Sequence, residues 1–264
     1  MSTYEIPIDI GGMPIGVYTT DSTFATLLRT RYKHFVRDNV HAQFRLDVET
    51  TAPEDGDADE DVSVTFSGAE WLVRRGDFRA HWDPIKRQGS VRQSANPYSI
   101  DAVLRIVHSL ILAGEGGFLL HGAGAIRNGR AFVFSGVSGA GKTTISSLAP
   151  ADVVLLTDEI SYIRPEGTGY RAFGTPFAGE LAQIGQNVSA PLDTLFLLAK
   201  GPENRVDEIN SAQAVQAILR NVLFFAEDDR LVRRLFDTAL DVVAKVKIRR
   251  LTFVPDQKVW ELVG

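Results

Sequence analysis

Apolar and polar residues alternate with a period of two along much of the first 95 residues. Apolar side chains alternate with charged ones in residues 42–49 (AQFRLDVE), and the same pattern recurs at 62–66 and 78–82. Such alternation predicts strands with one buried face. The apolar residues that follow Ser22 have helical spacing instead. Either Asp21 or Ser22 is placed to cap that helix.

The pattern changes near residue 100, where strands and helices begin to alternate. Ser99 is a candidate N-cap for an apolar helical stripe that ends near Gly114. The apolar runs that follow predict strands at 117–126, 131–135, 152–157, 160–164, 193–199 and 248–254, and helices at 142–149, 211–225 and 229–246. We therefore expect a β-rich region with one helix over residues 1–98 and an α/β domain over residues 99–264.

Residues 117–135 predict a β-hairpin. Two apolar runs, FLLHGAGAI and AFVF, are separated by a short turn that contains Asn128 and Gly129. Asn-Gly is a strong hairpin signal because both central positions of a type I′ turn need a positive φ. The two strands should be antiparallel, which makes the expected sheet mixed. This arrangement places His121 on the strand beside the loop that follows.

The segment directly after this hairpin, residues 136–143, fits the pattern G-x-x-x-x-G-K-[ST]. In that motif, backbone N–H groups turn toward phosphate oxygens, and the following helix points its positive end at the same charge. The lysine reaches the β- and γ-phosphates, and the next hydroxyl binds magnesium. The segment therefore predicts a P-loop that binds ATP and Mg²⁺, with Thr143 on the metal, through Gly136, Ser138, Gly139, Ala140, Gly141, Lys142, Thr143 and Thr144.

Two acidic residues, Asp158 and Glu159, follow the predicted strand 152–157, only a short helix after Lys142. A carboxylate at a strand end can order the shell of a magnesium ion or accept a proton from an attacking hydroxyl. The alternative is that both acids only stabilise a turn. A separate acidic run at 54–61 lacks the spacing of a calcium loop and is typical of a solvated loop.

Composition narrows the range of partners. The 264-residue chain has a formal net charge of −5, so electrostatics gives no reason to expect nucleic acid or an anionic membrane as a partner. The chain has no cysteine, which excludes disulfides, thiol catalysis and cysteine-bound zinc. No secretory signal or bilayer-length apolar run is visible, so a cytoplasmic protein is expected. The oligomeric state stays open, a homo-oligomer included.

The segments LLHGAG, GVSGAGKTT and LLTDEIS together resemble the C-terminal catalytic domain of the HPr kinase/phosphorylase family. They are still more similar to the shorter HPr-kinase-like proteins found beside peptide-modification genes. The resemblance covers roughly residues 100–260 and implies a P-loop fold of the phosphoenolpyruvate carboxykinase type. It also implies that Asp158 takes the proton of an acceptor serine and that His121 assists. By the same resemblance, Glu159 and Glu180 would be acids at the metal.

Two features of that family are missing. The N-terminal region does not resemble that of HPr kinase, and its Gly-Ile-Ile-Asp signature is absent, which weakens HPr as the substrate and phosphorolysis as the activity. His121 can also be read as a packed residue hydrogen-bonded to backbone.

The function expected from these features is a kinase. With Mg²⁺ bound, it would transfer the γ-phosphoryl group of ATP to a hydroxyl on a protein, peptide or small molecule. Serine is the first candidate for that hydroxyl. The alternative is a nucleotide-binding regulatory protein without transfer, which a glutamate at position 159 favours. An enzyme that acts on phosphoenolpyruvate is compatible with the expected fold, but the sequence shows no motif for binding that substrate. The acceptor and the nucleotide base are not identified by the sequence.

Overall fold

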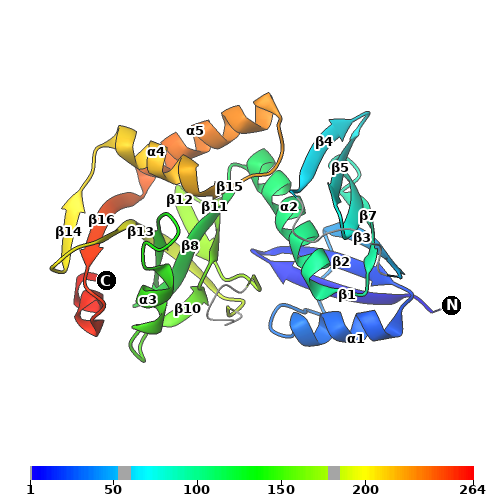
Figure 1. Cartoon of the computed structure of the whole chain (residues 1–264), viewed down its shortest axis with the longest axis horizontal. Helices are drawn as coiled ribbons and strands as arrows, with labels where there is room; N and C mark the ends of the chain where they lie inside the picture. Colours follow the sequence, from blue (N-terminus) through cyan, green and yellow to red (C-terminus); the bar gives the residue numbers. More distant parts are fainter. Residues whose placement is uncertain (1, 53–60, 178–184) are drawn as a thin grey trace. The chain divides into compact units, whose positions relative to one another are not determined.

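The computed structural model describes residues 2–52, 61–177 and 185–264 (Figure 1). The chain forms two compact units. Unit 1 comprises Met1–Ile111 and Phe224–Asp229, and unit 2 comprises Leu112–Leu223 and Arg230–Gly264. The boundary lies within helix α2 (Pro97–Glu115), and the chain returns to unit 1 after Leu223. Each unit has its own sheet and is described by itself.

Unit 1 contains a seven-stranded sheet with the order β1-β2-β3-β7-β6-β5-β4. The strands are β1 (Tyr4–Ile10), β2 (Met13–Thr19), β3 (Phe44–Thr51), β4 (Ser63–Ser67), β5 (Glu70–Arg75), β6 (Phe78–Asp83) and β7 (Gln88–Ser94). The β2–β3 and β3–β7 pairs are parallel, and the other neighbours are antiparallel. In β3, Phe44, Leu46 and Val48 are buried while the residues between them are exposed. The strands predicted from alternation are therefore confirmed.

The helices of unit 1 begin at residues with side-chain caps. Helix α1 (Ser22–Arg31) is capped by Asp21, whose Oδ1 accepts from the N–H groups of Thr23 and Phe24. Helix α2 begins at Pro97, not near Ser99, because Asn96 Oδ1 accepts from the Tyr98 N–H. Proline suits the first helical position since its missing N–H would have no partner there.

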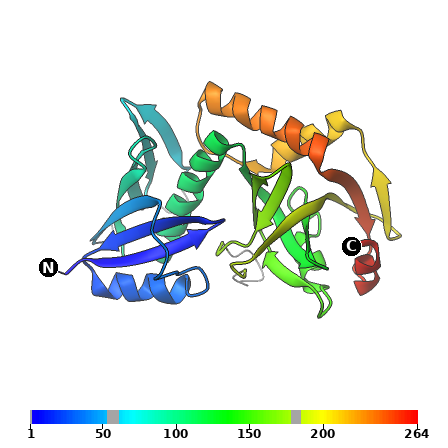
Figure 2. The same cartoon turned by 180° about the vertical axis from the view of Figure 1, so that it is seen from behind.

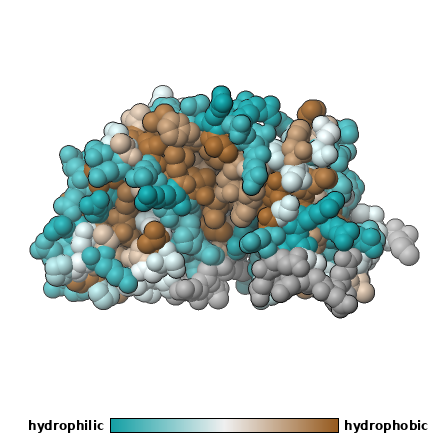
Figure 3. Space-filling view, turned by 45° about the horizontal axis from the view of Figure 1, so that its top comes forward, coloured by the Kyte–Doolittle hydropathy of each residue, from teal (hydrophilic) through white to brown (hydrophobic). Residues whose placement is uncertain are grey.

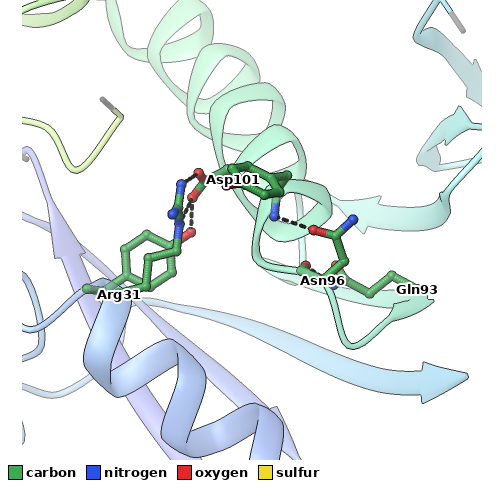
Figure 4. A network of polar contacts seen from close by, with 6 residues as sticks. Arg31, Gln93, Asn96 and Asp101 are labelled. Atoms are coloured by element: carbon green, nitrogen blue, oxygen red, sulfur yellow. Dashed lines mark hydrogen bonds and ion pairs between the residues drawn. The ribbon is translucent and has the colours of Figure 1, made fainter. Parts of the chain in front are cut away.

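A polar network in unit 1 joins α1 to the start of α2 (Figure 4). The buried carboxylate of Asp101 accepts hydrogen bonds from the guanidinium of Arg31 and the hydroxyl of Tyr32. The hydrogen bond to Asp101 raises the pKa of Arg31, and burial raises the pKa of Tyr32. Gln93 Nε2 donates to the carbonyl of Asn96 and fixes the turn before α2.

Unit 2 contains a mixed sheet. Its strands are β8 (Phe118–Arg127), β9 (Arg130–Ser135), β10 (Val154–Thr157), β11 (Ile160–Glu166), β12 (Gly169–Phe173), β13 (Ser189–Lys200), β14 (Arg205–Glu208), β15 (Val222–Leu223) and β16 (Lys247–Phe253). The described helices are α3 (Lys142–Ser147), α4 (Ser211–Asn221), α5 (Asp229–Lys245) and the 3₁₀ helix η1 (Gln257–Leu262). The whole chain is thus an α/β protein with mixed sheets and a β-rich N-terminal region, as the sequence predicts.

Strand pairing in unit 2 closes on itself. Strand β8 pairs with β11, β11 with β12, β12 with β13, β13 with β9, and β9 again with β8. Strand β13 is parallel to both β9 and β16, and the other pairings in this unit are antiparallel. The circuit brings the ends of strands that are distant in the sequence to one place.

The predicted hairpin is confirmed. Strands β8 and β9 pair antiparallel from Gly122↔Ser135 to Arg127↔Arg130. Asn128 has φ 51° and Gly129 has φ 72°, as a type I′ turn requires.

Helices α4 and α5 lie together along one side of the unit 2 sheet (Figures 1 and 2). A groove of about 910 Å³ runs between them and is lined by apolar side chains that include Val215, Leu219, Phe236 and Leu240. Figure 3 shows apolar residues gathered on the face that carries these helices. None of the described helices has the length and apolar content of a membrane span.

Candidate functional site

A cavity of about 340 Å³ in unit 2 gathers most of the residues that the sequence singles out. Its lining comes from β8, the loop after β9, α3, the break between β10 and β11, and the end of β13; the residues are His121, Ser138, Gly139, Gly141, Lys142, Thr143, Thr144, Asp158, Glu159 and Lys200. Among the predicted site residues, Gly136 and Ala140 do not line it. Glu180 lies outside the residues that the structure describes.

The glycine-rich loop, residues 136–141, connects the end of β9 to α3. It turns where the Ala140 N–H donates to the Val137 carbonyl at 3.0 Å. Gly139 has a φ of 74° and Gly141 a φ of 111°, values that residues with a Cβ rarely adopt. A Cβ on Gly136 would come within 2.8 Å of Ala140 Cβ. Gly136 and Ala140 therefore shape the loop without lining the cavity, whereas Ser138, Gly139 and Gly141 line it.

Lys142, the first residue of α3, is 9% exposed. Its Nζ donates to the carbonyl oxygens of Gly136 at 3.0 Å and Val137 at 3.3 Å. The ammonium group is thus held against the loop, at the wall of the cavity. A positive charge in this position favours an anionic ligand.

His121 lies in the middle of β8 and lines the same cavity. Burial and, to a smaller extent, the positive charge of Lys142 lower the pKa of His121. The ring is therefore neutral at pH 7, with one nitrogen that can accept a hydrogen bond. The Ser135 hydroxyl donates to the His121 carbonyl at 2.8 Å and ties β8 to the start of the glycine-rich loop.

Asp158 and Glu159 occupy a break in an otherwise continuous strand. Both β10 and β11 pair with β8, and the break falls between Thr157 and Ile160. Thr157 Oγ1 accepts from the N–H groups of Glu159 and Ile160, and the Glu159 carbonyl accepts from Gly122 at 2.8 Å. The backbone of the break is held by these bonds. Asp158 is 5% exposed and, like Glu159, lines the cavity.

Lys200 is a residue that the sequence reasoning missed. It is the last residue of β13, pairs in register with Phe253 of β16, and is exposed at the cavity. Its local sequence, a lysine after an apolar run, is ordinary. Only the parallel pairing of β13 with β9 and β16 brings this second ammonium group to the wall that Lys142 occupies.

The C-terminal segment packs against α3 and the glycine-rich loop. Trp260 Nε1 donates to the Ile145 carbonyl at 3.2 Å, and Arg127 Nη1 donates to the carbonyls of Trp260 at 2.5 Å and Val263 at 2.8 Å. The ring of Phe253 lies against Gly141. These contacts restrain the loop and helix whose residues line the cavity.

The donor set in the cavity fits a divalent cation bound together with an anionic ligand. Mg²⁺ is usually held by one or two carboxylates, and phosphate oxygens and water complete its shell. Glu159 and the Thr143 hydroxyl would supply such ligands, and Asp158 lines the same cavity. Among the described residues there is no group of three or more histidine or acidic side chains that would hold a metal by itself.

The fold and cavity define an α/β protein in which a glycine-rich loop, a lysine and an acidic pair meet on a mixed sheet. The family model described as "SynChlorMet cassette protein ScmC" matches residues 90–263, and the chain belongs to this family. Among solved structures, the chain is similar to the "Hpr(Ser) kinase/phosphatase from Coxiella burnetii", with 12% identity, a TM-score of 0.25, and coverage of 45% of this chain and 93% of that chain. A similarity this low carries no argument about function. No curated protein matches.

Proposed function

We propose that this protein is a kinase that transfers the γ-phosphoryl group of ATP to a hydroxyl on a protein, peptide or small molecule. Serine is the first candidate for that hydroxyl. The observation that carries the proposal is that Lys142, Asp158 and His121 share one cavity with the glycine-rich loop. The family description names a gene cassette and no reaction. The proposal therefore rests on the chemistry of the site, together with the resemblance of the motifs to HPr-kinase-like proteins.

The phosphate end of the site would be formed by the glycine-rich loop and Lys142, acting as a P-loop. Backbone N–H groups of the loop and the ammonium of Lys142 would hold the phosphate oxygens in line with the acceptor. Thr143 and Glu159 would hold Mg²⁺, with Glu180 as a further candidate ligand. When bound, Mg²⁺ supplies charge neutralisation on the β- and γ-phosphate oxygens. The cavity volume, about 340 Å³, falls within the range usual for small-molecule sites.

The acceptor end would be formed by Asp158 and His121. Asp158 would accept the proton as the acceptor O–H bond breaks and the new O–P bond forms, while ADP leaves with the electrons of the old bond. The neutral ring of His121 would accept a hydrogen bond from the acceptor and orient it. Positioning and charge stabilisation would supply most of the acceleration, as in other phosphoryl transfers.

Binding and transfer have to be measured separately to test this proposal. Calorimetry with Mg·ATP should show weak binding by Lys142→Ala and near-normal binding by Asp158→Asn. Transfer to acceptors in extracts of the source cells, followed by mass spectrometry, should fall by about 10²–10⁴ in Asp158→Asn, the usual worth of a positioned base. Glu159→Gln should instead weaken the magnesium dependence of binding. Asp237→Asn, which neutralises an exposed carboxylate on α5, is the matched control.

Two results would contradict the kinase. Unchanged ATP binding by a folded Lys142→Ala variant would remove the phosphate site. Tight Mg·ATP binding by the parent, with no phosphorylated product in the extract, would favour the nucleotide-binding regulatory protein. Equal transfer by Asp158→Asn and the parent would show that the proton goes elsewhere.

A further inference from the structure

Three arginines lie side by side across the sheet of unit 1. Arg74 on β5 is in register with Arg79 on β6, and Arg79 is in register with Arg92 on β7. Residues in register share a face of the sheet, and all three are exposed. Side chains directly opposite one another on neighbouring strands are about 5 Å apart at Cβ, and like charges there are destabilising. The fold therefore keeps three positive charges in a row against their mutual repulsion.

Other charged groups on this face have partners nearby. Arg45 forms two bonds to Asp47, with Nε–Oδ2 at 2.8 Å and Nη2–Oδ1 at 2.6 Å. The Tyr18 hydroxyl donates to Glu5 at 2.7 Å.

The three arginines differ from these groups. Within the part of the chain that the structure describes, no hydrogen bond or ion pair joins Arg74, Arg79 or Arg92 to a carboxylate. Glu49 on β3 lies in register with Arg92, but no ion pair joins the two side chains. Among the residues that the structure describes, the row thus has no paired carboxylate, on a face where other charges are paired.

The surface beside the row is concave. A cavity of about 640 Å³ is lined by Arg79 and Arg92 together with Arg45, Ser90 and Tyr18. Guanidinium groups bind carboxylates through two parallel N–H···O bonds, and hydroxyls add further hydrogen bonds. The arginines that line this cavity therefore offer the donors that an anionic ligand needs.

We propose that the arginine row (Arg74, Arg79 and Arg92) is a docking site for an acidic peptide segment of a partner protein. A single exposed ion pair contributes little, so an isolated carboxylate or phosphate would not be held. Several carboxylates on one segment add their pairs, because the later pairs form within the same complex. Acidic side chains three or four residues apart on a helix are 5–6 Å apart at Cβ, close to the strand spacing of 4.7–4.9 Å.

The surroundings of the row favour a peptide over nucleic acid. Asp47 and Glu49 line the same cavity and would repel a continuous phosphate backbone. A peptide can place its acids over the arginines and neutral residues over the two carboxylates.

Fluorescence anisotropy with the full chain tests the proposal. The probe is a labelled alanine-based helical peptide with glutamates at three successive i, i+4 positions, and its glutamine counterpart is the control probe. Arg79→Gln/Arg92→Gln should weaken binding of the glutamate peptide by about two- to thirty-fold, because two exposed ion pairs are lost. Arg230→Gln/Arg233→Gln removes the same two charges from exposed positions on α5 and should bind like the parent. Raising the salt from 50 to 200 mM should also weaken binding by the parent.

Three outcomes would overturn the proposal. The first is equal affinity of the parent for the glutamate and glutamine peptides. The second is an equal loss of affinity in the two double variants, which would mean that only net charge matters. The third is tighter binding of a labelled oligothymidylate through Arg79 and Arg92, which would make nucleic acid the occupant. Arg79→Lys/Arg92→Lys keeps the charge and should retain more affinity than the glutamine variant if the proposal holds.

Discussion

Gly141 offers a quantitative test of how the glycine-rich loop is held. The residue has φ 111°, and a Cβ added to it would lie 2.7 Å from Cζ of Phe253. Two penalties therefore act on Gly141→Ala, one from the backbone conformation and one from the clash. Gly139 separates them, because its φ is 74° but nothing lies within 4 Å of an added Cβ.

The size of each penalty follows from the geometry. A non-glycine residue in a sparsely populated backbone region costs about 1–3 kcal/mol. Ordinary carbon contacts are about 3.5–4.0 Å, and forcing extra atoms into a packed site typically costs about 1–3 kcal/mol. The stiffer unfolded chain of the alanine variant returns about 0.4–1 kcal/mol. Gly141→Ala should thus lower the free energy of unfolding by about 1–6 kcal/mol, and Gly139→Ala by about 0–3 kcal/mol.

Urea unfolding measures both variants. Trp260 lies in unit 2, while Trp71 and Trp82 lie in unit 1, so a Trp71→Phe/Trp82→Phe background makes the fluorescence report unit 2. The same pair of glycine variants should then be made with Phe253→Leu, which removes the atom that the new Cβ would meet. In that background the excess cost of Gly141→Ala over Gly139→Ala should largely disappear.

Two results would refute this reasoning. An equal cost for the two glycine variants would mean that the Phe253 ring moves aside freely. An excess cost that persists with Phe253→Leu would mean that backbone conformation alone makes Gly141 necessary.

Three further predictions concern the framework. Burial lowers the pKa of His108 to about 3, so its contribution to stability is present above pH 6.5 and is lost as the pH falls toward 3. Between pH 7 and pH 5 the free energy of unfolding of the parent should fall by about 2 kcal/mol more than that of His108→Leu. An equal fall in the two proteins, measured by urea unfolding at both pH values, would contradict this. Arg127→Gln should cost about 1–3 kcal/mol and speed amide exchange in η1, because the Trp260 and Val263 carbonyls lose their donor; unchanged exchange in 257–263 would disprove it. Asn128→Ala should lower the melting temperature by an amount that corresponds to about 1 kcal/mol, since its φ is 51°, whereas Asn128→Gly should not.

Features set by neighbouring residues could be predicted from the sequence. The Asn128–Gly129 turn is an example, because the backbone angles it needs are properties of those two residues. The Asp21 cap is another, since its oxygen reaches N–H groups two and three residues ahead. The sequence predicts the start of α2 at Ser99, but the helix begins at Pro97, although the residues that decide this, Asn96 and Pro97, are equally local.

Features set by strand order could not be predicted. Lys200 reaches the cavity only because β13 lies between β9 and β16, and nothing in its own sequence indicates either neighbour. The closed circuit of strands depends likewise on the pairing of β12 with β13. The prediction of catalytic roles for Asp158, Glu159 and His121 remains a proposal, since their gathering in one cavity describes position and not reaction.

The parallel strands of unit 2 also bear on how fast the site can form. Ala131 pairs with Leu192 and Thr194 pairs with Lys247, so each pairing closes a chain segment of more than fifty residues. Contacts between such distant residues make folding slow, because the entropy of closure is lost before the contacts stabilise the chain. The β8–β9 hairpin needs only local contacts and can form within microseconds. The glycine-rich loop would then be present early, but its restraint by Phe253 and Trp260 would come only with the last strand and η1, so a newly made chain should acquire its ligand affinity well after it acquires most of its secondary structure.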